Sequence, residues 1–122
     1  MIAVWVGAAG ALGAVARFVL EQWVTASRRA RFPLGTFVVN VTGSFLLGAV
    51  TGLATAHGLP ADARTIAGAG FLGGYTTFST FAYEVVRRAE AHEPAVAAGY
   101  LVASALAGTV AATLGLALTG GL

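Results

Sequence analysis

The chain has 122 residues, of which 57% are hydrophobic and 10% are charged, and its formal net charge is +2. Soluble domains carry about 25% charged residues, so this composition excludes an ordinary soluble domain and predicts that lipid surrounds most of the chain. The absence of cysteine excludes a disulfide framework, a thiolate zinc cluster and a thiol nucleophile.

Charged residues divide the sequence into four apolar stretches, at residues 2–26, 32–57, 64–86 and 94–119. A helix needs about 20 apolar residues to cross the hydrocarbon core of a bilayer, and each stretch is long enough. The sequence therefore predicts an all-α integral membrane protein, in which residues 1–122 form a single domain of four transmembrane helices. Because the connections are short, no residues remain for an extramembrane active site, and we expect that the protein is not an enzyme.

The first stretch has no basic region ahead of its apolar residues, which argues against a cleaved secretory signal. Towards its end, Arg17 and Glu21 are four residues apart and so share one face of a helix. We expect these two side chains to form an ion pair near the membrane interface.

Glycines are spread through the predicted helices instead of lying in the connections. Small residues let membrane helices approach closely, and the first two helices carry them at Gly7, Gly10, Gly13, Gly43, Gly48 and Gly52. Four helices packed this closely leave little room for a pore within one subunit. A conduction path would therefore run along the interface of a dimer.

A polar face runs along the second predicted helix. At a period of 3.6 residues, hydroxyl and amide side chains fall on one side at Thr36, Asn40, Ser44 and Thr51. Burying an unpaired amide costs about 1–3 kcal/mol, so Asn40 needs a hydrogen-bond partner or a water-lined path.

The third stretch contains a sequence near its centre that disfavours a continuous helix. Residues 73–77 (GGYTT) combine glycines with β-branched residues, and both weaken a helix. We expect the helix to break here, at the membrane midplane, with Thr77 or Ser79 capping its second half. A broken helix exposes backbone carbonyls and directs a positive helix N-terminus to mid-depth, which favours an anion. The alternative is a continuous helix whose threonines bond back to their own carbonyls.

On the fourth predicted helix, Tyr100 and Ser104 lie one turn apart on a common face, and Gly108 is next in line. Thr109 and Thr113 point elsewhere, and we expect their hydroxyls to bond back to the helix backbone. The polar faces of the second and fourth helices argue against a role limited to packing.

Three segments of the sequence resemble the Fluc (CrcB-type) fluoride ion channel family, and the resemblance covers essentially the whole chain. They are residues 10–17 (GALGAVAR), residues 35–45 (GTFVVNVTGSF) and residues 70–81 (GFLGGYTTFSTF), of which the run TTFSTF is highly specific. The resemblance implies an antiparallel dimer in the cell membrane with two fluoride pathways along the subunit interface. It also implies passive export of cytoplasmic fluoride down its electrochemical gradient, which lowers intracellular fluoride.

The resemblance also implies roles for individual residues. Phe78 and Phe81 match the family's paired phenylalanines, whose ring edges carry the positive part of the aromatic quadrupole and meet the anion. Asn40 is similar to the family's pore amide. The remaining residues of the implied fluoride pathway are Ser79, Thr80, Tyr100 and Ser104. One departure is visible, because the family's hydroxyl track continues at positions that are Gly108 and Ala112 here.

A structural sodium ion at the dimer centre is a further implication of the resemblance. Gly73 and Thr76 match the positions whose backbone carbonyls, two from each subunit, hold that ion. Four hard oxygen donors suit a hard cation.

Two other classes of function stay open at this point. A proton-coupled exporter of the small multidrug type has a similar size, but it would need a carboxylate deep in the first helix, and Glu21 lies near the end. A non-transporting membrane scaffold subunit would account for the glycines but not for the polar faces.

Arginines predict how the chain is oriented in the membrane. Four spans put the first and third connections on one side, and that side holds Arg28, Arg29, Arg31, Arg87 and Arg88. The other side, which holds both termini, has Arg64. Positive residues favour the cytoplasm, so we expect both termini outside. The second subunit is either an identical chain, inserted with dual topology, or a homologous chain of opposite topology, and the arginine bias favours the homologous chain.

Overall fold

The computed structural model describes residues 1–27, 32–120 and 122, and every regular element in this part of the chain is a helix. The elements are α1 (Ile2–Ser27), α2 (Leu34–Ala56), α3 (Ala61–Thr65), the π-helix η1 (Ile66–Leu72), α4 (Gly73–Tyr75), α5 (Phe78–Glu90) and α6 (Pro94–Leu118). The predicted all-α membrane fold is confirmed. Of the connection predicted at residues 27–31, only Ser27 lies within the described residues.

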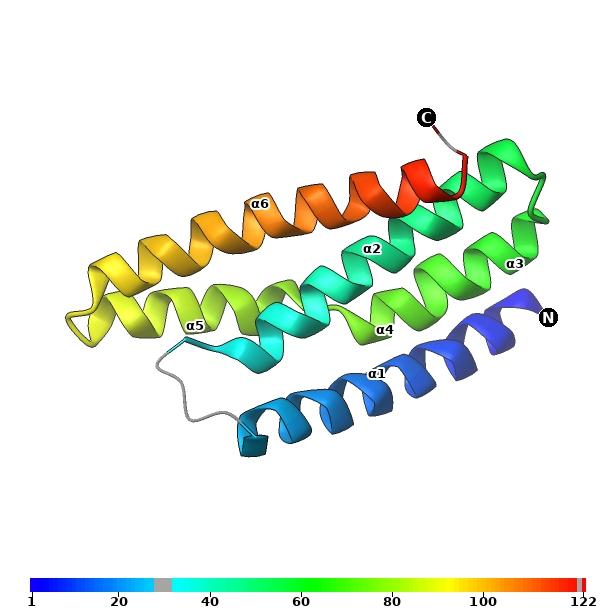
Figure 1. The fold of residues 1–122 in the computed structure, drawn as a ribbon. Helices are drawn as coiled ribbons and strands as arrows, with labels where there is room; N and C mark the ends of the chain where they lie inside the picture. Colours follow the sequence, from blue (N-terminus) through cyan, green and yellow to red (C-terminus); the bar gives the residue numbers. More distant parts are fainter. Residues whose placement is uncertain (28–31, 121) are drawn as a thin grey trace.

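Three helices, α1, α2 and α6, are each long and apolar enough to cross a membrane. The fourth crossing is assembled from α3, η1, α4 and α5, which follow one another along a common direction between α1 and α6 (Figure 1). Both termini lie at the end of the molecule where α2 connects to α3 (Figure 1). The helical hairpins therefore run antiparallel, as expected for a chain that crosses a bilayer four times.

Glycines set the spacing between helices. At Gly48, an added Cβ would overlap the Ala112 carbonyl of α6, and at Gly115 it would overlap the Phe45 carbonyl of α2. On the other side of the molecule, a Cβ at Gly74 would overlap the carbonyl of Gly10 in α1. Without side chains at these positions, the backbones of α2 and α6 and of α1 and α4 come into direct contact.

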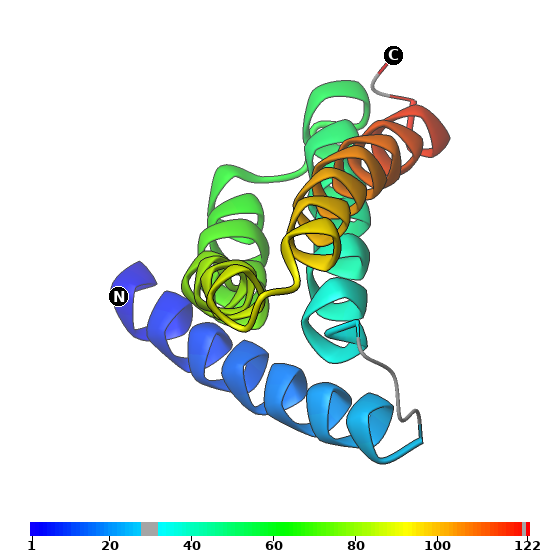
Figure 2. The same cartoon turned by 90° about the vertical axis from the view of Figure 1, so that its left-hand side faces the viewer.

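The helices leave much of their apolar surface uncovered within one chain. The buried cluster consists of Val39, Leu72 and Tyr75, whereas large apolar side chains on α1 and α6 are exposed. In water such a surface would be unstable, but in a bilayer it faces acyl chains or a second subunit. Figure 2 shows α1 at the edge of the helix bundle, with α3–α5 between α1 and α6.

Two exposed tryptophans on α1 locate the bilayer along this helix. Trp5 and Trp23 are 60% and 67% exposed, and a separation of 18 positions corresponds to about 27 Å of helix. That length is close to the hydrocarbon core of about 30 Å, and tryptophan favours the two membrane interfaces. Gly13, near their midpoint, packs against the backbone of Phe71 and Tyr75. The end of α4 therefore lies near the membrane midplane.

Candidate functional site

The fourth crossing breaks between α4 and α5, where two residues adopt extended backbone conformations. Thr76 has φ −82° and ψ 159°, and Thr77 has φ −144° and ψ 122°. The predicted break is confirmed, and the continuous-helix alternative is wrong. The cause differs in part from the prediction, because Gly73 is helical (φ −61°, ψ −38°) and Gly74 lies within α4. The chain unwinds at the threonine pair, while Gly74 serves close packing against α1.

Thr77 caps the second half of the broken helix. Its Oγ1 accepts a hydrogen bond from the backbone N–H of Thr80 at 3.2 Å, and its hydroxyl donates to Thr80 Oγ1 at 3.1 Å. Of the two candidate caps, Thr77 is therefore the one that acts, while Ser79 Oγ lies 3.4 Å from Thr77 Oγ1. The N-terminus of α5, the positive end of its dipole, consequently points into the break at mid-depth.

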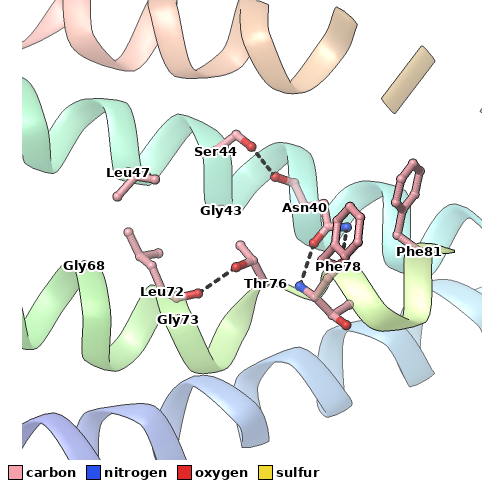
Figure 3. Close-up of a pocket in the computed structure, with 11 residues that line it drawn as sticks. Asn40, Gly43, Ser44, Leu47, Gly68, Leu72, Gly73, Thr76, Phe78 and Phe81 are labelled. Carbon is pink, nitrogen blue, oxygen red and sulfur yellow. Dashed lines mark hydrogen bonds between the residues drawn. The ribbon is translucent and has the colours of Figure 1, made fainter. Parts of the chain in front are cut away.

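Asn40 of α2 binds both backbone groups of Thr77. Its Nδ2 donates to the Thr77 carbonyl at 2.8 Å, and its Oδ1 accepts from the Thr77 N–H at 2.9 Å (Figure 3). In a continuous helix that N–H would donate to the carbonyl of Gly73, so Asn40 leaves the Gly73 oxygen free of its helical donor. The amide predicted to need a partner has one, and Nδ2 carries a second N–H for another acceptor.

A cavity of about 340 Å³ opens beside the break, between α2 and the fourth crossing (Figure 3). It brings together five residues predicted for the site: Asn40, Gly73, Thr76, Phe78 and Phe81. The rest of its lining is Gly43, Ser44, Leu47, Gly68, Leu72 and Thr77. Four of the predicted residues, Ser79, Thr80, Tyr100 and Ser104, do not line this cavity.

The aromatic side chains form a row that starts at this cavity. The ring centroids of Phe78 and Phe81 are 6.1 Å apart at an interplanar angle of 53°, and those of Phe81 and Tyr100 are 5.1 Å apart at 60°. Phe78 is 80% exposed. A phenylalanine this exposed beside an open cavity is available to a second subunit.

Glu84 is a residue of this region that the sequence analysis did not identify. Its Oε2 accepts from the hydroxyl of Tyr100 at 2.8 Å, and its Oε1 accepts from Thr36 Oγ1 at 3.0 Å. The hydroxyl of the fully buried Tyr100 is therefore engaged by a carboxylate. A signal was present in the sequence, since Glu84 follows Phe81 by one helical turn and α5 would place it on the same face.

A second cavity, of about 320 Å³, lies beyond this hydrogen-bonded group. Thr80 and Glu84 reach it from α5, Thr36 from α2 and Glu21 from α1. The Oε1 atom of Glu21 is buried and has no hydrogen-bond partner among the described residues. Thr80, which was predicted to lie near an ion path, thus faces this second cavity.

The predicted ion pair between Arg17 and Glu21 is wrong. The guanidinium of Arg17 donates instead to the backbone carbonyl of Thr76, at 3.3 Å, in the break. Among the residues that the structure describes, the ion pair is that of Arg88 with Glu93, at 2.9 Å. The cause is the rotation of α1, which packs against η1 and α4 and so turns Arg17 towards the unwound carbonyl.

The remaining hydroxyls of α6 and α2 divide into two groups. Thr109 and Thr113 bond back to carbonyls one turn earlier, at 2.8 Å and 2.9 Å, as predicted. Ser44 does the same with the carbonyl of Asn40, at 2.8 Å. Ser104 differs, because its Oγ is buried without a partner among the described residues. A buried hydroxyl without a partner is a site at which another donor or acceptor is expected.

Comparisons with known proteins agree on one family. The family model described as "CrcB-like protein, Camphor Resistance (CrcB)" matches residues 4–116. A protein named fluoride-specific ion channel FluC 1, from Leifsonia xyli subsp. xyli, is 56% identical over 90 residues, which are 74% of this chain and 66% of that protein. Fluoride-specific ion channel FluC 2 of Cutibacterium acnes is 45% identical over 97% of both chains. Fluoride-specific ion channel FluC of Acidobacterium capsulatum is 42% identical over 92% of this chain and 90% of its own length.

Proposed function

The chain belongs to the CrcB-like family. On that premise we propose that this multi-pass membrane protein is a fluoride-specific ion channel. The observation that carries the proposal is the break at Thr76 and Thr77, held by Asn40 beside a cavity that two phenylalanines line. Neither the drug exporter nor the scaffold subunit finds support in the relatives, whose names all describe fluoride channels.

The proposed mechanism is passive export. Hydrogen fluoride crosses bilayers as a neutral acid and ionises in the cytoplasm, where the anion is trapped. A channel selective for the anion lets the inside-negative membrane potential expel it. Such a channel does no covalent chemistry, and it needs neither a nucleotide nor a proton-carrying group in its core.

We propose that fluoride passes the cavity beside the break. The second N–H of Asn40 Nδ2 and the positive N-terminus of α5 would attract the anion there. The edges of the Phe78 and Phe81 rings would face it, since the edge is the positive part of the aromatic quadrupole. The roles proposed for Ser79, Thr80, Tyr100 and Ser104 rest on the family resemblance.

We propose a dimer of antiparallel subunits in the cell membrane, because one chain leaves Phe78 and the cavity open. A structural sodium ion between the two breaks would be held by the carbonyls of Gly73 and Thr76. The residues fit such an ion. The Gly73 carbonyl has lost its helical donor, because the N–H of Thr77 goes to Asn40. The Thr76 carbonyl accepts from Arg17 through one lone pair, and its second lone pair can bind the ion. A bound sodium ion would supply positive charge at the centre of the dimer.

The channel function is tested by the paired phenylalanines. Replacing Phe78 or Phe81 with Ile is expected to slow fluoride efflux from liposomes about tenfold or more, because an aliphatic side chain has no positive edge. A fluoride electrode measures the efflux, and cross-linking checks that the variants still form dimers. The control is Phe18→Ile, a phenylalanine that is 62% exposed on α1, which should leave efflux unchanged.

Unchanged efflux in both the Phe78 and the Phe81 variants would show that these rings only fill space, since a core tolerates an aliphatic side chain of similar size. If the unaltered protein transports no fluoride, either alone or together with a homologous chain of opposite topology, the proposed function itself is wrong. Drug transport driven by a proton gradient would then indicate the exporter, and no transport of either kind would indicate the scaffold.

Orientation is tested with cysteines, which the natural chain lacks. A single cysteine placed near either terminus is expected to react with a membrane-impermeant maleimide from outside intact cells. The reason is the excess of arginine in the first and third connections, five residues against Arg64 on the side of the termini. This result would favour a partner chain of opposite topology. Equal labelling from both sides, together with fluoride efflux from this chain purified alone, would instead show a homodimer of dual topology.

A further inference from the structure

The break deprives the carbonyls of Gly73 and Thr76 of their helical donors. In a continuous helix, Thr77 would donate its N–H to Gly73, and Thr80 would donate its N–H to Thr76. Here the N–H of Thr77 goes to Asn40 Oδ1 and the N–H of Thr80 goes to Thr77 Oγ1. The cap that starts α5 therefore removes the donor of the Thr76 carbonyl.

Arg17 supplies the missing donor from another helix. Its Nη1 lies 3.3 Å from the Thr76 oxygen, across 59 positions of sequence. Because Gly10 and Gly13 bring α1 against η1 and α4, the half-buried guanidinium reaches the unwound backbone from the side opposite Asn40. Thr76 and Thr77 are thus held from two sides, by α1 and by α2.

Arg17 lies deep in the membrane, where a charged side chain needs a specific partner. It lies four positions beyond Gly13, about 6 Å along the helix from the level of the membrane midplane. A charged side chain at such depth is costly and faces protein or a polar partner. The nearby Glu21 forms no ion pair with it. The charge of Arg17 is directed at the backbone of the break.

We propose that Arg17 is a positioning residue of the break: its guanidinium replaces the Thr80 N–H at the Thr76 carbonyl, keeps Thr76 and Thr77 extended, and thereby fixes Phe78 beside the cavity. The efflux measurement that tests this role rests on the proposed channel function. The second measurement, hydrogen exchange of the backbone amides in the break, is independent of transport. Two simpler roles compete with it, a purely electrostatic attraction of anions and a purely apolar packing of the arginine stem.

The test compares Arg17→Met with Arg17→Lys in the full-length protein in liposomes. Methionine matches the length of the stem without a donor, whereas lysine keeps both a donor and the charge. Amide hydrogen exchange is measured over residues 76–81, with residues 105–112 of α6 as an internal reference, and fluoride efflux is measured in the same preparations. Arg87→Gln serves as the control, because it removes an arginine whose hydrogen bond goes to Tyr83 within α5.

In the Met variant we expect exchange over residues 76–81 to be about tenfold faster or more, as for the loss of a charged hydrogen bond. Efflux should fall in parallel, and the Lys variant should restore both. The Arg87 control should change neither. If Arg17→Met does not assemble, Arg17→Gln replaces it, since its shorter side chain stays polar but does not reach the carbonyl.

Two results would overturn the inference. Slower efflux with unchanged exchange in the Met variant would assign Arg17 a purely electrostatic role. Unchanged efflux together with unchanged exchange would assign its stem to packing. If the protein transports no fluoride even together with a homologous chain of opposite topology, but shows the expected change in exchange, the channel function is disproved while the positioning role stays intact.

Discussion

Replacing Asn40 with leucine is expected to abolish fluoride efflux and to destabilise the protein. Leucine has a similar volume but removes both hydrogen bonds to Thr77, at 2.8 Å and 2.9 Å. Each buried backbone group left without a partner costs about 1–3 kcal/mol. The change should be seen as a lower midpoint of thermal unfolding and as loss of efflux in the electrode assay.

Ser44→Ala is the matched control on the same face of α2. Ser44 lines the same cavity, but its hydroxyl bonds back to the carbonyl of Asn40 in its own helix. Removing it leaves the break untouched, so both stability and efflux should stay close to those of the unaltered protein. Wild-type efflux from the Asn40→Leu protein would contradict the role assigned to this amide.

The largest loss of stability is expected from Gly13→Ala in α1. A Cβ at this position would overlap the carbonyl of Phe71 and lie 2.9 Å from the backbone nitrogen of Tyr75. Backbone atoms of a packed helix cannot yield as a flexible side chain would, so we expect a cost of about 3 kcal/mol or more, at the upper end for overpacking. Because α1 would be pushed away from α4, the break should also lose its contact with Arg17.

Gly7→Ala tests whether this effect is due to contact rather than to the residue type. No atom lies within 4 Å of a Cβ built at Gly7, and alanine favours a helix over glycine by about 1 kcal/mol. The Gly7 variant should therefore be as stable as the natural protein or more so. Equal stability of the two variants would show that α1 does not pack through Gly13 in the assembled protein.

Much of the fold could be predicted because it depends on local properties of the sequence. The length and hydropathy of the spans identify a membrane protein, and the composition of residues 73–77 indicates a break. The exact point of unwinding could not be predicted from composition, because glycine serves both flexible backbone and close helix packing. Only the contact of Gly74 with Gly10 decides between these uses.

The partners of polar side chains were harder to predict, because they depend on how each helix is rotated. The four-residue spacing of Arg17 and Glu21 favoured an ion pair, but packing of α1 directs Arg17 to Thr76. Asn40 needed a partner, yet nothing local indicates one that lies 37 positions away. Glu84 lies in the middle of α5, one helical turn beyond Phe81, but only the packing of α6 shows that its partner is Tyr100.

The exposed tryptophans of α1 have a practical consequence for spectroscopy. The chain has two tryptophans, Trp5 and Trp23, and both lie on this one helix. Tryptophan fluorescence therefore originates from α1 alone, although the protein has several helices. Any change of emission wavelength or intensity on transfer between detergents and lipids reads the surroundings of that single helix, without a dye or an engineered label.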